Sequence, residues 1–228
     1  ATMPNAIATF ANNILTDPVQ VAVTPVAKTA DRVAQEVMFV DTQHKTDALV
    51  HVLKKDEVKH ALVFTRTKHG ADKVVKNLVR MGVPSEAIHG NKSQGQRERT
   101  LAAFRKGSIR VLVATDIAAR GIDVEAISHV INYELPHVAE TYVHRIGRTA
   151  RAGRGGVAWS LVTPEQGKLR AGLHELGAVR EEHFDELGRS LLDIRLPRRE
   201  FMQLMARLGE KAETYLPPEE QEKSVWEP

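Results

Sequence analysis

The feature that most constrains the fold is a repeated alternation of short, β-branched apolar runs with longer amphipathic stretches. The short runs have the length and composition of buried strands: Val33–Val40, Ala61–Thr65, Glu86–His89, Arg110–Thr115, His129–Tyr133 and Gly156–Val162. Between them, Leu, Val or Phe recurs three and four positions apart, as on one face of a helix, in Lys45–Lys55, Gly70–Met81, Gln94–Lys106 and Ala139–Arg151. This alternation is typical of βαβ units, so we predict an α/β fold with an open, mainly parallel sheet and helices on both faces.

The periodic pattern divides the chain into three parts. Residues 1–32 contain prolines at intervals and show weak periodicity, and we interpret them as a lead-in or linker. Residues 33–178 hold the alternating pattern and form the predicted domain. We interpret residues 179–228 as a helical extension with an acidic tail, because Glu181–Leu192 and Arg198–Ala212 are polar with helical spacing and the last residues are rich in glutamate.

Composition excludes several classes of protein. The 228 residues include no cysteine, which rules out disulfides, thiolate metal sites and a cysteine nucleophile, and which suits a reducing cytoplasm. No apolar run approaches the roughly 18 residues of a membrane helix, and the first residues lack the pattern of a signal peptide. We therefore expect a soluble cytoplasmic protein that makes no membrane contact.

Charge is distributed unevenly along the chain. The net charge is +3, but residues 179–228 hold 8 basic and 12 acidic side chains, so the remainder is basic. A basic body is compatible with nucleic acid or nucleotide phosphate as a partner, although solvated surface charge would also explain so small an excess. Aromatic residues make up only 5% of the chain, so any grip on nucleic acid should involve its backbone more than base stacking.

The strongest local signal is an arginine-rich run, His144-Arg145-Ile146-Gly147-Arg148-Thr149-Ala150-Arg151. Arg145, Arg148 and Arg151 are three apart on a predicted helix, so we expect their guanidinium groups to project from about the same side. Guanidinium groups bind phosphate oxygens in a bidentate manner and keep their charge. The run therefore predicts an anion site, in preference to a solvated basic helix end.

A second signal is the loop that follows the strand candidate Arg110–Thr115. The strand delivers Thr115 and Asp116 to the sheet edge where ligands of such sheets bind, and Arg120-Gly121-Ile122-Asp123 follows as a turn. Glycine lets a backbone approach a ligand closely, and carboxylates at strand ends commonly accept ribose hydroxyls. A helix cap would also explain Thr115 and Asp116.

Two further strand candidates, Ala61–Thr65 and Glu86–His89, also end in polar loops. Each loop offers hydroxyls, backbone amides or basic side chains of the kind that contact a backbone phosphate: Thr67, Lys68, Gly90, Gln94 and Arg97. Ser93 has the position of a helix cap. A helix cap and an ordinary surface loop would explain these two loops nearly as well.

Several kinds of site are absent from the sequence. No G-x-x-x-x-G-K-[ST] phosphate loop occurs, and there is no second acidic cluster of the kind that holds a phosphate-bound magnesium ion. The histidines show no metal-ligand spacing, so we predict no metal site. The chain has residues that could complete a nucleoside triphosphate site, but it lacks the part that binds the triphosphate.

These elements, in this order and spacing, resemble the second RecA-like lobe of the DEAD-box ATP-dependent RNA helicases of superfamily 2. The resemblance covers about Val33 to Thr163, and Ala1-Thr2-Met3-Pro4 resembles the end of the Ser-Ala-Thr motif that closes the first lobe. The run His144–Thr149 separates this family from its DEAH and RecQ-type relatives. The general pattern is similar to the bacterial RhlE-like branch. Ala150 departs from the family pattern, in which many members have glycine.

The resemblance implies roles on the nucleotide side. Arg148 and Arg151 match arginine fingers, which reach the γ-phosphate when the two lobes close and stabilise the transition state. His144 matches the residue that contacts the acidic motif of the first lobe and couples RNA binding to hydrolysis. The remaining matches form the turn whose carboxylate accepts the ribose hydroxyl of ATP: Arg120, Gly121 and Asp123.

On the RNA side, the matching residues lie in or beside motifs that hold a single strand chiefly by phosphate and sugar: Thr67, Gln94, Arg97, Thr115 and Asp116. Such binding is salt-sensitive and tolerant of base sequence. ATP and Mg²⁺ would be bound mainly by the N-terminal RecA-like lobe, which is missing from this sequence. We therefore expect the whole protein to couple ATP hydrolysis to RNA duplex unwinding, and this fragment alone to be nearly inactive.

A competing interpretation is a stand-alone RNA-binding or scaffolding module without ATPase activity of its own. The stripe Phe201, Leu204, Met205 and Leu208 in the 198–212 helix supports it, because an apolar stripe could dock a protein partner or a second copy. Packing against its own domain is the simpler role for this stripe. A third interpretation, a DNA-processing lobe of the same superfamily, is weakened by the run His144–Thr149.

Overall fold

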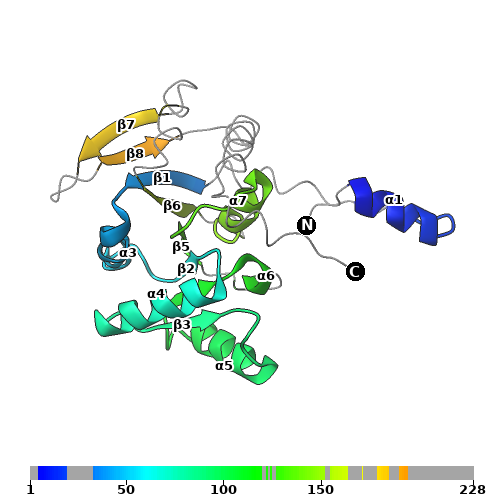
Figure 1. The fold of residues 1–228 in the computed structure, drawn as a ribbon, viewed down its shortest axis with the longest axis horizontal. Coiled ribbons are helices and arrows are strands. Elements are labelled where there is room, and N and C mark those ends of the chain that lie inside the picture. The colour runs from blue at the N-terminus through cyan, green and yellow to red at the C-terminus, as the bar shows by residue number, and fades with distance from the viewer. Residues whose placement is uncertain are drawn as a thin grey trace, which may run out of the picture.

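All six expected strands form, and they lie side by side as the parallel part of one sheet (Figure 1). The computed structural model describes residues 5–19, 33–119, 122, 124, 127–151, 155–163, 171, 179–184 and 190–194. The six strands are β1 (Val33–Phe39), β2 (Ala61–Phe64), β3 (Ser85–Ile88), β4 (Val111–Ala114), β5 (His129–Asn132) and β6 (Gly156–Val162). Their spatial order is β3-β4-β2-β5-β6-β1, and every neighbouring pair among them is parallel. All six carboxyl ends therefore meet at one edge of the sheet.

The strands form where the sequence is apolar because the sheet is covered on both faces. Every residue of β2, β4 and β5 is buried, as expected of parallel strands between two layers of helices. Successive side chains of β2 alternate between the two layers: Val63 packs into one core, while Leu62 and Phe64 pack into the other. The apolar runs thus supply both cores at once.

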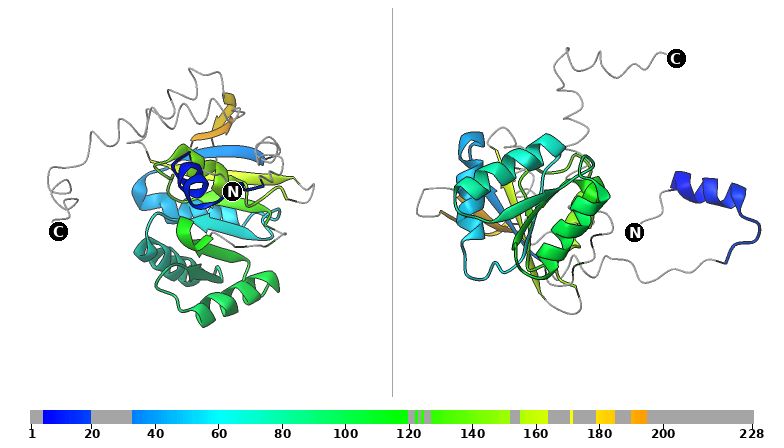
Figure 2. Two further views of the ribbon diagram at one scale, coloured as in Figure 1. Left: turned by 90° about the vertical axis from the view of Figure 1, so that its right-hand side faces the viewer. Right: turned by 90° about the horizontal axis from the view of Figure 1, so that it is seen from below.

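The helices lie on both sides of the sheet, as predicted (Figure 2). On one face are the 3₁₀ turn η1 (Thr42–His44), α3 (Lys45–Leu53) and α4 (Lys68–Arg80), of which α3 and α4 supply apolar side chains to the first core. On the other face are α5 (Gln94–Arg105), α6 (Asp116–Ala119) and α7 (Ala139–Ile146). Local caps fix where α4 and α5 start: Thr67 accepts a hydrogen bond from the Gly70 amide, and Ser93 forms a capping box with Gln96.

The prediction of a helix over Glu181–Leu192 is wrong, because this segment contains an antiparallel pair of strands. These are β7 (Val179–Phe184) and β8 (Ser190–Ile194), and β8 also pairs antiparallel with β1. Ser190, Leu192 and Ile194 are all buried, so the buried side recurs every second residue, as in a strand. The glutamates masked this short alternation. The predicted 198–212 helix and the acidic tail lie outside the described residues.

A helix also forms in the predicted lead-in. This helix, α1, spans Asn5–Ile14, and it exposes Ile7, Phe10 and Ile14 by 51 to 62% of their surface. These three residues recur at helical spacing on one side of α1. The sequence reasoning missed the helix because alanine, asparagine and threonine between the apolar residues weakened the pattern.

At the amino-terminal edge of the sheet, a hydroxyl and an imidazole join the starts of β2 and β5. Ser128 Oγ donates to the His60 carbonyl oxygen at 2.9 Å and accepts the His60 amide at 3.2 Å. His129 Nδ1 lies 2.9 Å from the same hydroxyl, and the His129 residue is only 4% exposed. Burial lowers the pKa of His129 below its ordinary value of 6.5, because the charged imidazolium is poorly solvated there.

One packing contact predicts a strict requirement for glycine at the start of β6. A Cβ on Gly156 would lie 2.7 Å from the backbone nitrogen of Ala150 and would overlap the Thr149 side chain. Thr149 cannot easily move, because its hydroxyl donates to the Ile127 carbonyl oxygen at 2.6 Å. We expect Gly156→Ala to lower the free energy of unfolding by about 2–3 kcal/mol, measured by urea denaturation. Gly95→Ala is the control: nothing lies within 4 Å of its added methyl, and helix propensity should leave stability unchanged or raise it.

His129 predicts how stability depends on pH. Because its pKa is lower in the folded protein than in the unfolded chain, the unfolded chain binds more protons as the pH falls below about 6.5. The contribution of neutral His129 to stability is therefore complete above that pH and is lost as the pH falls through the folded-state pKa. Melting temperatures between pH 7.5 and 5 should fall less steeply for His129→Gln than for the parent chain. An equal slope in both, or an equal change in His69→Gln on the exposed face of α4, would contradict this assignment.

Candidate nucleotide and nucleic-acid edge

The carboxyl edge of the sheet gathers most of the residues singled out in the sequence. Thr67 and Lys68 follow β2, Gly90 follows β3, and Thr115 follows β4. The same edge is flanked by the first turn of α5 and the start of α6, which carry Gln94, Arg97 and Asp116, and by α7, which carries His144. Arg148 and Arg151 lie beyond α7, and Thr149 between them donates to the Ile127 carbonyl oxygen just before β5, so this turn lies toward the amino-terminal edge. Arg120, Gly121 and Asp123 lie outside the described residues. The parallel topology thus brings to one edge candidates that are up to 49 positions apart, from Thr67 to Asp116.

A buried arginine ties this edge together. Arg145 is 1% exposed, and its Nε and Nη2 donate to the two carboxylate oxygens of Asp116 at 2.6 and 2.8 Å. Its Nη1 donates to Asn132 Oδ1 at 3.1 Å and to the Glu134 carbonyl oxygen at 2.6 Å. The guanidinium carbon also lies 4.9 Å from the centroid of the Phe64 ring. A single side chain therefore connects α7 with α6 and with the strand ends of β5 and β2.

The expectation that Arg145, Arg148 and Arg151 project from one side of a helix is wrong. The helix α7 ends at Ile146, and Gly147 is its cap, so Arg148 and Arg151 lie in the turns beyond it. Arg145 points into the protein because it shares the buried side of α7 with Tyr142 and Ile146. That apolar spacing, at three and four residues, was the signal in the sequence that Arg145 is a structural residue.

The two later arginines are held in a compact turn. Arg148 Nη1 lies 3.5 Å from the Ile122 carbonyl oxygen, and Arg151 Nε donates to the Gly147 carbonyl oxygen at 3.2 Å. Ala150, between them, has a φ of 55°, in the left-handed region that favours glycine. The structure thus places Arg148 and Arg151 beyond the end of α7, whereas Arg145 is buried within the helix.

Asp116, which we predicted to contact RNA, also has a structural role, because it pairs with the buried Arg145. Both carboxylate oxygens are bonded to Arg145, while 36% of the side chain is exposed. Arg97 Nη2 lies 3.4 Å from the Ala118 carbonyl oxygen, so α5 contacts the short helix α6 that Asp116 begins. These contacts fix the loop after β4 against its neighbours.

Helix caps account for part of the polar loops. Thr67 accepts the Gly70 amide at 3.0 Å, and Ser93 caps α5 as the sequence predicted. The backbone amide of Arg66, in the same loop, donates to Glu134 Oε2 at 2.8 Å, and the Arg66 Nη1 lies 3.1 Å from His137 Nε2. These contacts join the loop after β2 to the loop after β5.

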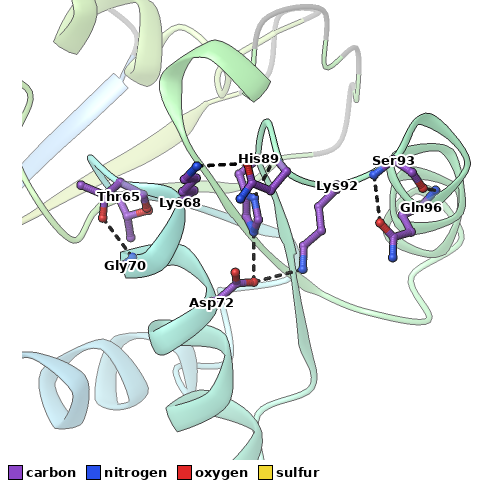
Figure 3. A network of polar contacts seen from close by, with 10 residues as sticks. Thr65, Lys68, Gly70, Asp72, His89, Lys92, Ser93 and Gln96 are labelled. Carbon is purple, nitrogen blue, oxygen red and sulfur yellow. Dashed lines mark hydrogen bonds and ion pairs between the residues drawn. The ribbon is translucent and has the colours of Figure 1, made fainter.

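A second polar network links α4 to the loop between β3 and α5 (Figure 3). Asp72 Oδ1 lies 3.0 Å from both His89 Nε2 and Lys92 Nζ, and Lys68 Nζ donates to Asn91 Oδ1 at 3.1 Å. Partial burial acts to raise the pKa of Asp72, but the contacts with His89 and Lys92 outweigh it and hold the pKa below its ordinary value of 3.8. Sequence reasoning found Lys68 and Gly90 here and missed Asp72, which lies on the preceding helix.

Nothing in the described part of the chain resembles a metal centre. Among those residues, no group of three or more His, Asp or Glu side chains is placed to hold a metal ion. None of the described helices is long and apolar enough to cross a membrane. The polar groups described at this edge include guanidinium, ammonium, hydroxyl and amide groups, which suit phosphate, beside the carboxylates of Asp116 and Glu134, which pair with arginine.

Comparison with known proteins identifies the family. The Helicase conserved C-terminal domain matches residues 44–153. The ATP-dependent RNA helicase DeaD of Mycobacterium tuberculosis is 44% identical over 179 residues, which is 78% of this chain and 30% of DeaD. The DEAD-box protein SrmB of E. coli, crystallised with regulator of ribonuclease activity A, is 41% identical over 59% of this chain and 79% of its own, with a TM-score of 0.56. The chain belongs to the DEAD-box RNA helicase family.

Within this family, the chain corresponds to the C-terminal RecA-like domain. The S. cerevisiae DEAD-box protein Dbp5 bound to RNA and ADP BeF3 covers 92% of this chain with a TM-score of 0.64 and 26% identity, and the chain covers 53% of that structure. The chain spans about a third of the length of the curated relatives it matches. Relatives of the DEAD-box type confirm the resemblance stated above, while the assignment to the RhlE-like branch stays a prediction.

The Arg145 contacts predict a large loss of stability when this side chain is shortened or loses its charge. In the DEAD-box domain Arg145→Met, Asn132 Oδ1 and the Glu134 carbonyl oxygen lose their donor and Asp116 loses its bidentate partner. We expect the free energy of unfolding to fall by about 2–4 kcal/mol, measured by urea denaturation. Arg80→Met, at the exposed end of α4, should change it by less than about 0.5 kcal/mol. Equal effects of the two substitutions would show that the buried pair contributes no special stability.

Proposed function

We propose that this chain is the C-terminal lobe of an ATP-dependent RNA helicase, and that it supplies half of the cleft in which ATP hydrolysis is coupled to RNA duplex unwinding. The observation that carries the proposal is the turn beyond α7, where Arg148 Nη1 lies 3.5 Å from the carbonyl oxygen of Ile122, which stands in the sequence between Gly121 and Asp123. The candidates that directly follow strands, Thr67, Gly90 and Thr115, lie at the carboxyl edge, where open α/β sheets bind their ligands. The family relationship to ATP-dependent RNA helicases such as DeaD supports the same assignment.

Arg148 and Arg151 have the chemistry that a transferring phosphoryl group requires. A guanidinium group stays protonated and offers a planar fork of donors, so it can stabilise negative charge on phosphate oxygens in the transition state. His144, in the last turn of α7, would contact the first lobe as the lobes close. Arg120, Gly121 and Asp123 would contact the ribose of ATP, as the family resemblance implies. Each of these roles is part of the proposal.

ATP and Mg²⁺ would be held mainly by a first lobe. The described residues of this edge offer cationic and neutral donors to phosphate but no grouped carboxylates for a magnesium ion. These residues therefore suit contact with the phosphate groups of a nucleotide, and they do not supply the carboxylate ligands of a magnesium site. The chain alone should turn over ATP very slowly, because arginine fingers with no positioned triphosphate have nothing to stabilise.

RNA would lie along the carboxyl edge of the sheet and would be bound through its sugar-phosphate backbone. Thr67, Lys68, Gly90, Gln94 and Arg97 are exposed or partly exposed there, as is Thr115, and none is an aromatic residue that could stack on a base. Phosphate and sugar contacts of this kind tolerate any base sequence and weaken with salt. The partners we propose are single-stranded RNA and the first lobe, in the cytoplasm. A further partner at the 198–212 segment remains a prediction.

Arg148→Ala tests the proposal most directly. The chain is mixed with the first lobe encoded by the same gene, and ATP hydrolysis is followed with and without RNA. We expect activity only in the mixture, dependent on RNA, and a fall of roughly 10³-fold or more with Arg148→Ala, as for a lost arginine finger. Arg80→Ala, an exposed arginine at the far end of α4, should leave the rate unchanged.

Two results would contradict the proposal. The first is RNA-stimulated hydrolysis by the 228-residue chain alone at the rate of the two-lobe mixture. The second is unchanged hydrolysis by the Arg148→Ala mixture at saturating RNA. The second result would favour an RNA-binding or scaffolding module in which the arginines serve only to bind.

A further inference from the structure

The loop between β3 and α5 lies at the RNA side of the carboxyl edge and is held from outside by α4. It begins at His89 and runs through Gly90, Asn91 and Lys92 to Ser93, which caps α5. Figure 3 shows Asp72 of α4 facing this loop, with His89 and Lys92 directed toward its carboxylate. Asp72 and Lys92 are 20 positions apart, so the contact is tertiary and fixes one element against another.

Two bridges cross from α4 to the loop. In the first, a single oxygen of Asp72, Oδ1, lies 3.0 Å from His89 Nε2 and 3.0 Å from Lys92 Nζ. In the second, Lys68 Nζ donates to Asn91 Oδ1 at 3.1 Å. The side chains of His89, Asn91 and Lys92 therefore all contact the first two turns of α4.

His89 makes this arrangement dependent on Asp72. The imidazole is buried, with 3% of the side chain exposed, and its Nδ1 faces the Asn91 amide, which donates to it at 3.4 Å. An Nδ1 that accepts carries no proton, so in the neutral ring the proton is on Nε2, the nitrogen that faces Asp72. Among the described residues, no hydrogen bond of regular geometry reaches Nε2. The Asp72 contact is therefore what compensates the burial of this nitrogen.

We propose that Asp72 is a positioning residue for RNA binding: its carboxylate fixes the Gly90–Ser93 loop against α4 before RNA arrives. This inference rests on the proposed RNA-binding function of the edge. The loop carries the exposed Gly90 and leads directly into Gln94 and Arg97 of α5, so its position sets where these three groups meet the RNA backbone. A loop that is already ordered loses less conformational entropy on binding than a mobile one.

Because Asp72 is charged, a positioning role and a role as a surface charge alone predict opposite changes in RNA affinity. Asp72 is half exposed, with 50% of its side chain accessible, and it carries a negative charge near a surface proposed to bind a polyanion. If it were only a surface charge, its removal would tighten RNA binding by reducing repulsion. A positioning role predicts the opposite sign, because the loop loses its anchor. The direction of the change therefore decides between the two.

Two neutral substitutions separate the charge from the hydrogen-bond acceptor. Asp72→Asn removes the charge and keeps an oxygen that His89 and Lys92 can reach, while Asp72→Ala removes both. We expect RNA affinity in the order parent, then Asn, then Ala, with Ala weaker than the parent by roughly 5- to 10-fold. Binding of the 228-residue chain to a fluorescein-labelled ten-nucleotide oligouridylate would be measured by fluorescence anisotropy. Asp56→Ala, an exposed carboxylate before β2, is the control and should not weaken binding.

A kinetic measurement separates positioning from general loss of structure. In the mixture with the first lobe, Asp72→Ala should raise the RNA concentration for half-maximal ATPase stimulation by the same factor and leave kcat at saturating RNA unchanged, since Asp72 acts on His89 and Lys92 in the loop before α5, while Arg148 and Arg151 lie in the turn beyond α7. Alanine suits the interior of a helix, so α4 should persist, which circular dichroism can verify. Equal or tighter RNA binding by both Asp72 variants overturns the inference alone. Absence of RNA binding and of RNA-stimulated hydrolysis in the parent protein overturns the proposed function, and this inference with it.

Discussion

The arrangement of the carboxyl edge depends on the burial of one charged side chain. Burying a guanidinium group is costly unless its donors are paired, and Arg145 meets this condition with two oxygens of Asp116, one of Asn132 and one backbone carbonyl. These acceptors come from three different elements of the chain. The charge can therefore be buried only when α6, α7 and the end of β5 are all in their native places. The pair acts as a test of correct assembly at the edge where we propose that ligands bind.

The two ends of the sheet illustrate different uses of polar groups in one fold. At the amino-terminal edge, Ser128 and His129 satisfy backbone groups and one another, and the neutral imidazole is favoured by burial. At the carboxyl edge, polar side chains link successive loops, among them the exposed Arg66 and Lys68. Both sets are held by the same apolar strands, which are buried along their whole length in the centre of the sheet. The core is thus common to both edges, while the loops differ in their chemistry.

The sequence was sufficient to predict the elements whose buried residues recur at a regular spacing along the chain. The six parallel strands have apolar runs, and each was located to within about one residue, as β2 and β6 show. The caps Thr67 and Ser93 could be read in the same way, because a cap is a contact over three residues. Thr67, Gly90 and Thr115, which directly follow three strands, also lie at one edge, since parallel strands end together.

Where the partner is distant, the sequence was not sufficient. Nothing adjacent to Arg145 indicates that its partner is Asp116, 29 positions away, and its spacing from Arg148 suggested a row of cations. The strand β8 is defined by pairing with β1, more than 150 positions earlier, and its alternation is only five residues long. Asp72 was overlooked because an exposed aspartate on a helix is usually only a solvated charge. In each case a tertiary contact overrides what the local pattern favours.

Ala150 lowers the backbone conformational entropy of the loop between Arg148 and Arg151. Its backbone is left-handed, with a φ of 55°, a conformation that costs an alanine roughly 1–2 kcal/mol and that glycine adopts freely. An alanine also has fewer alternative backbone states than a glycine. The loop therefore has fewer backbone conformations available and loses less conformational entropy if the proposed anion binds to its two arginines. Part of the ordering that such an anion would otherwise impose is already present in the folded chain.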